Sequence, residues 1–420
     1  MVHQSPHVHS ADRERARRLS FEHMTERLYY TDSMLREFSA RVVARRESDA
    51  GPAVQLDRTA FYPTSGGQPF DTGKLDDIPV LEVWEDEGGE IWHQVERLPI
   101  AETVRGVIDW ERRFDHMQQH SGQHLLSGAF MRMLQAPTIS FHLGSEESFI
   151  DLDFPGLDWE EVFLVEAEVN RVIWEDRPLE VHLVDEEEIR KIPLRRPPQV
   201  SGKIRVIWIR DYDAVPCGGT HVPHTGAVGL VKVTRLEHYK GGMRVGFLCG
   251  RRALHDYQRV LRGMQGVSTD LSVHTDELKD AVGRLQDETK QARRALRAAQ
   301  GELAALEAER LWTAAPAHDE VRRVVAHLPE RTFEQALCLA SQLSSRPRTL
   351  ALLAVSEAKG TRLVCQRSAD LSQTDAATIL RRAAESLGGR GGGTATQAQG
   401  GAPAQPHEVI LEALRSAAAK

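Results

Sequence analysis

Two short strings about a hundred residues apart constrain the fold of this chain more than any other feature. They read His120-Ser-Gly-Gln-His124 and Cys217-Gly-Gly-Thr-His221. Each places two nitrogen or sulfur donors at positions i and i+4, on one face of a helix or at the two ends of a tight turn. Imidazole and thiolate are the donors that a tetrahedral zinc ion prefers. We therefore predict one zinc ion per chain, held by His120, His124, Cys217 and His221, in a hydrolytic site where one ligand can give way to water or substrate.

Composition indicates a globular protein of several domains. The length of 420 residues allows roughly two to four domains, and a hydrophobic content of 41% is enough to build their cores. No stretch approaches the roughly twenty consecutive apolar residues of a membrane span, and the N-terminus lacks the apolar core of a signal peptide. The four cysteines are widely scattered, which favours a reducing compartment without disulfides. We expect a cytoplasmic protein that does not engage a membrane.

The net charge of −8 argues against a polyanionic partner, but the charge is unevenly distributed. Residues 189–252 contain thirteen Lys or Arg and three acidic residues, an excess of ten positive charges. A solvated surface is the simpler interpretation of such a run. A nucleic-acid-binding surface is the alternative, and it gains weight because the Cys217 string lies inside this segment.

The first hundred residues divide into an arm and a β-rich segment. Residues 1–23 show almost no apolar periodicity, which indicates a disordered arm. Between residues 24 and 100, short alternating runs are separated by Gly, Asp and Pro, the pattern of antiparallel strands. The string over 61–73 is too rich in Gly and Pro for a strand interior. We expect an ordered loop that brings backbone N–H groups close to a ligand, with a tight hairpin that binds nothing as the alternative.

The predicted zinc ligands fall on a helix and on a loop. Residues 112–134 have helical periodicity and contain no proline, so His120 and His124 should point the same way. Strands and a further helix between the two strings indicate an α+β layer. Short strands bracket the second string, and its two glycines should let the chain turn sharply enough for Cys217 and His221 to converge.

A long helix and a mixed segment follow. Apolar residues over 278–306 recur with 4-3 spacing, the seam of a weak coiled coil. This seam fits a helical spacer, a helix folded back on its neighbour, or contact with a second copy. The last hundred residues alternate as β-α-β-β-α. We interpret the glycine-dense stretch 388–393 as a loop suited to a phosphate backbone, with Arg390 as its charge; a flexible linker would have the same composition.

Four motifs in this order carry a family resemblance: Ser65-Gly-Gly-Gln68, the two metal-binding strings, and the glycine-rich tail that ends in Ala398-Gln-Gly-Gly401. The combination resembles the editing region and C-terminal module of alanyl-tRNA synthetase in their free-standing long form, the alanyl-tRNA editing proteins of AlaX type. The resemblance covers nearly everything after Met24, and no part resembles the aminoacylation core. The threonyl-tRNA synthetase editing domain shares both metal-binding strings but lacks this tail. Ser121 stands where the family usually has threonine, a small change between hydroxyls.

The resemblance implies an α+β protein that hydrolyses mischarged tRNA(Ala), chiefly Ser-tRNA(Ala). Its partner would be tRNA(Ala) carrying a wrong amino acid, and a homodimer through the helical segment or the C-terminal domain stays open. The expected parts are a disordered arm (1–23), a small β-barrel (24–100), an editing domain with the zinc site (101–251), a helical coiled-coil connector (252–312) and a tRNA-binding α/β domain of DHH-associated type (313–420).

Residue roles follow from this resemblance and from the chemistry of an activated ester. The site must place water beside the carbonyl, stabilise the oxyanion and hydrogen-bond the serine hydroxyl, so that alanine is spared. We assign Gln68 and Thr59 to the reaction and to recognition of the hydroxyl. Zinc would either acidify the attacking water or grip the substrate. The residues assigned to substrate binding are Ser65, Gly66, Gly67, Arg390, Gly391 and Gly392.

Two other function classes compete with the hydrolase. In the first, all four ligands close around the ion, and the chain is a zinc-stabilised tRNA-binding protein without catalysis. In the second, the tail belongs to a DHH-type phosphoesterase. That class needs clustered aspartates and an Asp-His-His motif, which Asp115-His116-Met117 does not supply. The hydrolase alone requires a cleft beside the ligands that is wide enough for an acylated adenosine.

Overall fold

The computed structural model describes residues 24–48, 51–198, 202–318 and 320–419, and the disordered arm predicted over 1–23 lies outside these ranges. The chain divides into two compact units, Met1–Gly266 and Val267–Lys420. The five expected parts are a finer division and stay a prediction. Within the described ranges, no helix combines the length and the apolar content that a bilayer crossing requires.

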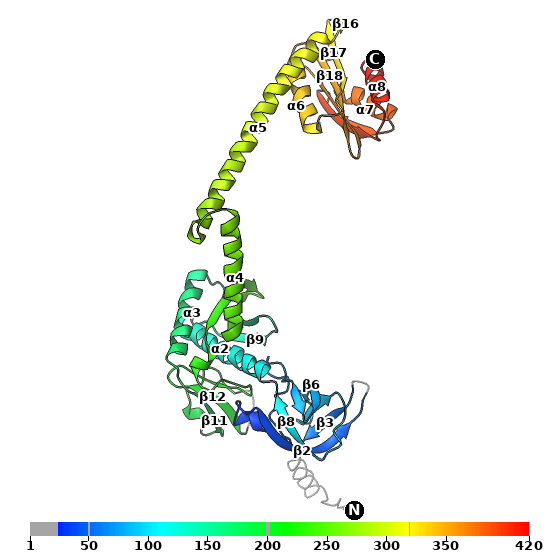
Figure 1. The fold of residues 1–420 in the computed structure, drawn as a ribbon. Helices are drawn as coiled ribbons and strands as arrows, with labels where there is room; N and C mark the ends of the chain where they lie inside the picture. The colour runs from blue at the N-terminus through cyan, green and yellow to red at the C-terminus, as the bar shows by residue number, and fades with distance from the viewer. Residues whose placement is uncertain (1–23, 49–50, 199–201, 319, 420) are drawn as a thin grey trace, which may run out of the picture. The chain divides into compact units, whose positions relative to one another are not determined.

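The first unit begins with the small β-barrel that the resemblance implies (Figure 1). Alternating apolar residues fill its interior, among them Val54 and Ile91, which are fully buried. The barrel is closed in the order β2-β3-β7-β6-β5-β8, with β2 (Glu37–Arg46), β3 (Ala53–Leu56), β5 (Gly73–Leu75), β6 (Ile78–Glu85), β7 (Ile91–Val95) and β8 (Thr103–Ile108). A short parallel pair, β1 (Glu26–Arg27) and β4 (Arg58–Thr59), lies outside this closed sheet.

An α+β layer follows the barrel. Helix α2 (Trp110–Leu134) begins at Asp109, whose side chain accepts from the Arg112 N–H, and ends at Gln135 in the left-handed conformation. Helix α3 (Trp159–Trp174) packs beside it, and α4 (Gly250–Asp270) follows the last strand. One antiparallel sheet has the order β14-β15-β10-β9, from Val231–Tyr239, Gly242–Cys249, Ser148–Leu152 and Thr138–Leu143. A second has the order β11-β12-β13, from Leu179–Val184, Ile204–Ile209 and Asp213–Pro216.

A buried ion pair joins the barrel segment to α2. The side chains of Arg113 and Asp71 are both fully buried. Arg113 donates from Nε to Asp71 Oδ2 at 2.9 Å, from Nη1 to the Ser33 carbonyl at 3.0 Å, and also to the Ala60 carbonyl. Asp71 Oδ2 accepts the Tyr62 N–H at 2.7 Å as well. These bonds hold the glycine-rich loop over 61–73 against the first turn of α2.

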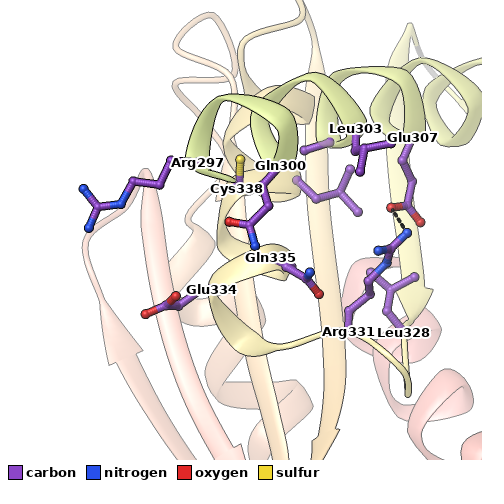
Figure 2. A pocket seen from close by; sticks show the side chains of 11 residues that line it. Arg297, Gln300, Leu303, Glu307, Leu328, Arg331, Glu334, Gln335 and Cys338 are labelled. Atoms are coloured by element: carbon purple, nitrogen blue, oxygen red, sulfur yellow. Dashed lines mark ion pairs between the residues drawn. The ribbon is translucent and has the colours of Figure 1, made fainter. Parts of the chain in front are cut away.

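The second unit is built on a six-stranded sheet of order β16-β17-β18-β19-β21-β20. Helix α5 (Leu278–Ala314) packs against α6 (Phe333–Ser344), and a small cavity of about 270 Å³ lies between them. Figure 2 shows side chains from both helices lining it, with Glu307 and Arg331 paired at 3.2 Å. The other elements are β16 (Ala317–His318), β17 (Val321–His327), β18 (Thr349–Glu357), β19 (Gly360–Arg367), α7 (Ala376–Ser386), β20 (Arg390–Gly393), β21 (Gln397–Ala402) and α8 (His407–Ala419).

The glycine-dense tail is a pair of strands, so its interpretation as a loop is wrong. Strand β20 pairs antiparallel with β21, residue for residue from Arg390 opposite Gly401. A Cβ at Gly391 would lie 2.5 Å from Leu380 of α7, and one at Gly389 would lie 2.1 Å from the Gly401 carbonyl. Gly389 and Gly391 therefore lie too close to their neighbours for a side chain, whereas a Cβ at Gly392 would meet nothing within 4 Å.

The apolar seam of α5 is exposed in the single chain. Leu296, Leu303 and Leu306 are 59%, 60% and 71% exposed. The face of α5 that packs in its own unit carries the buried Ala304 and Ala308 instead. Coiled-coil pairing through the seam stays a prediction.

Loss of one partner of the buried pair should destabilise the first unit. Asp71→Asn keeps the shape of the side chain but leaves the Arg113 guanidinium buried without a counter-charge, which costs about 3–5 kcal/mol of unfolding free energy. Urea denaturation followed by tryptophan fluorescence measures the loss. Asp77→Asn, which removes the carboxylate of an exposed pair with Arg97, is the control and should leave the midpoint unchanged. Equal midpoints for both variants would contradict the role of the buried pair.

Candidate metal centre

The four predicted ligands converge in the first unit. His120 and His124 lie one turn apart on α2, and Cys217 and His221 lie in the loop after β13. Their ligand atoms all lie within 4.8 Å of one another. Cys217 Sγ is 3.4 Å from His120 Nε2 and 3.3 Å from His221 Nε2. Nitrogen and sulfur ligands of one tetrahedral zinc ion are about 3.3–3.8 Å apart, so these separations suit a shared ion.

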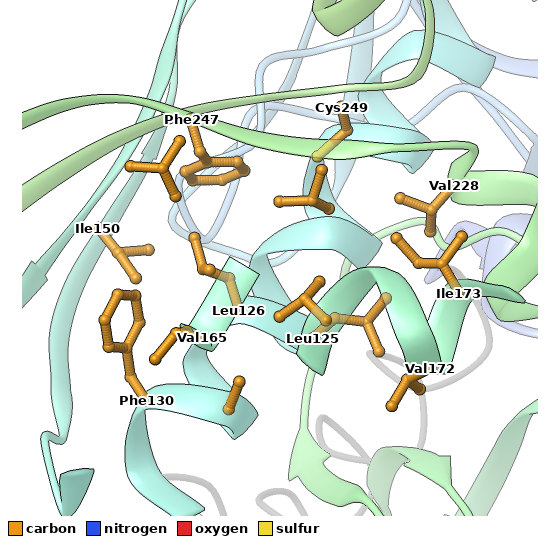
Figure 3. Packing of buried hydrophobic residues seen from close by; sticks show 14 of the residues in the cluster. Leu125, Leu126, Phe130, Ile150, Val165, Val172, Ile173, Val228, Phe247 and Cys249 are labelled. Atoms are coloured by element: carbon orange, nitrogen blue, oxygen red, sulfur yellow. The ribbon is translucent and has the colours of Figure 1, made fainter. Parts of the chain in front are cut away.

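Helix α2 is fixed by an apolar core on the face opposite the histidines. Leu125, Leu126 and Phe130 pack there among side chains of α3 and the neighbouring sheet (Figure 3). Gly122 lies between the two ligands, and a Cβ on it would approach Cys249 Sγ to 2.2 Å. A residue without a side chain is therefore needed for α2 to lie this close to β15, and the close packing sets the position of both imidazoles.

Hydrogen bonds behind the cluster orient its rings. His120 Nδ1 is 2.8 Å from Gln68 Oε1, and His221 Nδ1 is 3.0 Å from Ser121 Oγ. A ring that donates from Nδ1 to an oxygen presents the lone pair of Nε2 to a metal. His124 Nδ1 is buried, and it has no hydrogen-bond partner among the described residues. The cluster therefore has imidazole nitrogens that can bind a metal ion.

Burial also prepares the cluster for a cation. Burial and the nearby Arg205 lower the pKa of His120 to about 3, and burial lowers the pKa of His124 and His221 well below 6.5. These rings are therefore neutral and can donate a lone pair. Burial raises the pKa of the Cys217 thiol, while the Gly219 N–H and Arg205 act in the opposite direction. Three neutral imidazoles and one thiol form a donor set that fits zinc.

The two glycines of the second string have different roles. Neither is among the glycines with positive φ, so no left-handed backbone conformation makes a glycine necessary at either position. A Cβ at Gly219 would lie 2.2 Å from His120 Cε1 and 2.5 Å from its Nδ1. A Cβ at Gly218 would meet nothing closer than Tyr30 Oη at 3.4 Å. Gly219 is needed because the His120 ring packs directly on its backbone.

Arg205 is a structural residue of the site that the sequence did not reveal. It lies on β12 and is only 6% exposed. It donates to the carbonyls of Cys217 at 2.8 Å, Gly219 at 2.9 Å and Tyr30 at 2.9 Å. An arginine within an otherwise apolar strand, Ile204–Ile209, was the available signal, but it was counted with the surface cations.

The basic segment over 189–252 is largely neutralised in the fold. Many of its cations pair with carboxylates, most of them from other segments, which the local count of charges could not detect. Five of its thirteen cations form no ion pair with an acidic residue in the described part of the chain, and Arg196 and Lys203 are two of them. The pairs include Arg195 with Asp213, Lys232 with Glu166, Arg235 with Glu147, Arg244 with Asp151 and Arg252 with Asp115.

A cavity of about 430 Å³ opens beside the cluster, and His120, His124 and Cys217 line it. Ser65 and Gly66 of the loop over 61–73 belong to its wall, and their contact with a substrate stays a prediction. Gly67 packs instead on the Phe141 backbone, where a Cβ would meet the carbonyl oxygen at 2.7 Å. The wall also includes the polar side chains of Gln123, Thr138 and Ser140, beside the apolar Ile139 and Phe141.

A second cavity of about 420 Å³ adjoins the first. The two share Ser65, Cys217 and Arg196, and the second adds Tyr30 and Lys203. Arg196 and Lys203, which lack an acidic partner among the described residues, therefore both line the cavity that adjoins the cluster.

The other assigned residues lie behind the cavity wall or in the second unit. Gln68 is buried, and its Nε2 donates to Thr220 Oγ1 at 2.8 Å. Its Oε1 accepts hydrogen bonds from His120 Nδ1 and from the Thr220 N–H. Thr59 Oγ1 is 2.8 Å from His93 Nε2 and accepts the Phe61 N–H. Neither Gln68 nor Thr59 is among the residues that line the cavity. Their direct contact with a substrate stays a prediction, as does that of Arg390, Gly391 and Gly392 on β20.

Packing at Gly219 should control metal binding. Gly219→Ala would displace the His120 ring and lower zinc affinity about 10–100-fold, the range seen when ligand-supporting groups are lost. Gly218→Ala is the matched control and should bind zinc as tightly as the parent chain. Competition with a chromophoric chelator measures both affinities. If the two variants bound zinc equally tightly, the close approach of His120 would not matter.

Comparisons with known proteins relate nearly the whole chain to one family. Residues 204–245 match the model of the threonyl and alanyl tRNA synthetase second additional domain. The chain is 31% identical over 414 residues to the alanyl-tRNA editing protein AlaX-L of Pyrococcus horikoshii, which covers 94% of this chain and 99% of that protein. It is 32% identical over 402 residues to the alanyl-tRNA editing protein Aarsd1 of Mus musculus, which covers 91% of this chain and 95% of that protein. The solved C-Ala domain of Aquifex aeolicus alanyl-tRNA synthetase matches 25% of this chain and 96% of its own, at 23% identity and a TM-score of 0.23. The chain belongs to the alanyl-tRNA editing protein family.

Proposed function

We propose that this chain is a trans-editing hydrolase that removes a wrong amino acid, chiefly serine, from mischarged tRNA(Ala) at a zinc site. The observation that carries the proposal is the cavity of about 430 Å³ beside the cluster. Ligand pockets of about 300–1,000 Å³ hold small molecules of the size of an acylated nucleoside. A zinc ion with a purely structural role has no need of such an opening, so the cavity favours the hydrolase over a non-catalytic tRNA-binding protein.

The residues of the site would divide the work of ester hydrolysis. His120, His124, Cys217 and His221 would hold the zinc ion, which when bound would supply Lewis acidity to a water or to the amino group of the substrate. Gln68 acts as a positioning residue, because both ends of its amide are used to hold His120 and the loop after β13. The wall formed by Ser65 and Gly66 leaves space for the ester beside the cluster.

The polar wall supports discrimination of serine from alanine. Gln123 Nε2 donates to Ser127 Oγ at 2.8 Å, and Thr138 Oγ1 donates to the same oxygen at 2.7 Å. Both side chains are thereby held at the cavity. A serine hydroxyl could hydrogen-bond to these polar side chains, whereas the methyl group of alanine could not. We propose that Gln123 contributes to recognition of the hydroxyl, a role the sequence led us to give to Gln68 and Thr59.

The adjoining cavity suits the end of the tRNA. Arg196 and Lys203 offer positive charge to the phosphates that precede the terminal adenosine, and Tyr30 adds an aromatic ring to the wall. Because this cavity shares Cys217 with the first, the single-stranded acceptor end could lie in one while the aminoacyl group lies in the other.

Deacylation assays test the proposal directly. We expect the purified chain to hydrolyse Ser-tRNA(Ala) and to spare Ala-tRNA(Ala). Chelation of zinc should abolish the activity and re-addition should restore it. Cys217→Ala should lower the rate at least a hundredfold, because the site loses an anionic ligand. Binding of tRNA(Ala) without hydrolysis of any of Ser-, Gly- or Ala-tRNA(Ala) would support the non-catalytic alternative.

Two glutamines should separate positioning from specificity. Gln68→Ala should lower zinc affinity and slow Ser- and Gly-tRNA(Ala) hydrolysis by similar factors, with little change in tRNA binding. Gln123→Ala should keep zinc affinity and slow Ser-tRNA(Ala) about tenfold more than Gly-tRNA(Ala), since only serine carries the hydroxyl. Single-turnover rates at a fixed enzyme concentration, together with zinc titrations, measure both effects. A similar loss for both substrates in Gln123→Ala would remove its proposed role.

A further inference from the structure

A separate polar cavity of about 510 Å³ lies in the first unit, where α2 and α4 begin. Arg112 and His116 of α2 and Arg251 and Arg252 of α4 line it. None of the four zinc ligands is among its lining residues. The cavity therefore belongs neither to the metal centre nor to the cavities beside it.

The charges at this cavity favour an anion. Arg252 pairs with Asp115 through Nε at 2.9 Å and also donates to the Gly144 carbonyl at 2.7 Å. Arg251 lies 3.6 Å from Glu111 in a pair that is largely exposed. The three arginines thus face two carboxylates. The N-terminal turns of two long helices add partial positive charge.

His116 supplies an independent sign of a missing ligand. Its side chain lines the cavity and is only 3% exposed. Nδ1 is buried and has no hydrogen-bond partner among the described residues. Buried polar atoms in folded proteins nearly always have a partner, so an unpaired one calls for a ligand or water. A neutral imidazole can donate one N–H to an anion.

We propose that this cavity is a phosphate-binding site for RNA, distinct from the metal centre. Arginine forks and helix N-termini are the groups that hold phosphate oxygens in proteins. The rings of Trp110 and Phe114, 5.6 Å apart, add an apolar wall that a sugar or base can contact. The choice of RNA as the source of the phosphate rests on the proposed function, and a free nucleotide is the other source of the same chemistry.

Binding measurements on the full chain test this site. The probes are inorganic phosphate, AMP, and an unacylated RNA hairpin that copies the acceptor arm of tRNA(Ala). Arg251→Gln removes a cation whose side chain is 64% exposed, so the fold should persist. Arg112→Gln repeats the test from α2. Arg262→Gln is the matched control, because it removes the same charge from an exposed position on α4 outside the cavity.

We expect Arg251→Gln and Arg112→Gln each to weaken hairpin binding about tenfold. Each should also reduce the slope of log affinity against log salt concentration by about the value of one phosphate contact. Arg262→Gln should change neither the affinity nor the slope. Weaker AMP and phosphate binding with unchanged hairpin binding would assign the site to a free nucleotide and overturn the choice of RNA. Equal behaviour of all three variants on every probe would overturn the site itself. If the parent chain hydrolysed Ser-tRNA(Ala) while all three variants bound every probe equally, this inference would fail and the proposed function would stand. Removal of zinc should abolish hydrolysis without changing hairpin binding at this cavity.

Discussion

The packing of the His120 ring on the Gly219 backbone is the contact on which the metal centre depends. It joins a helix to a loop that lies about a hundred residues further along the chain. A side chain at Gly219 would occupy the volume of the ring itself. Gln68 then bonds to both partners, through His120 Nδ1 and Thr220, so three distant segments are locked at one point. The donors converge because this contact is close, and their hydrogen bonds decide which nitrogens are left free for a metal ion.

Rigid supports surround this contact. The apolar core holds α2 from the opposite side, and Gly122 lets the helix approach β15. The buried pair of Arg113 and Asp71 holds the glycine-rich loop to the same helix. Arg205 ties down the carbonyls of the loop after β13. A site whose geometry is set by packing in this way is organised before any ligand arrives, which lowers the cost of binding.

Local patterns predicted the parts of the fold that depend on short-range spacing. The sequence predicted the i, i+4 donors and the helix that carries His120 and His124. It also predicted the β-rich segment that closes into the barrel. The glycine tail was misjudged, because composition does not tell a loop from strands that pass under a helix, as Gly391 does under Leu380. The net positive charge of the basic segment was overestimated, because the carboxylates that pair with its cations are distant in sequence. Gln68 was selected from its motif, but its contacts with His120 and Thr220 could not be predicted, because those residues are distant in sequence.

The proposed hydrolase requires one accessible metal ion where the four side chains converge. Cobalt titration of the metal-free protein tests this most directly, because thiolate ligation gives Co²⁺ a strong and distinctive absorption. We expect saturation at one equivalent per chain and a tetrahedral spectrum that includes the thiolate band. That spectrum should change when a non-hydrolysable seryl-amide analogue of the terminal adenosine is added. Absence of saturable binding, or a spectrum that the analogue leaves unchanged, would contradict the proposed hydrolase.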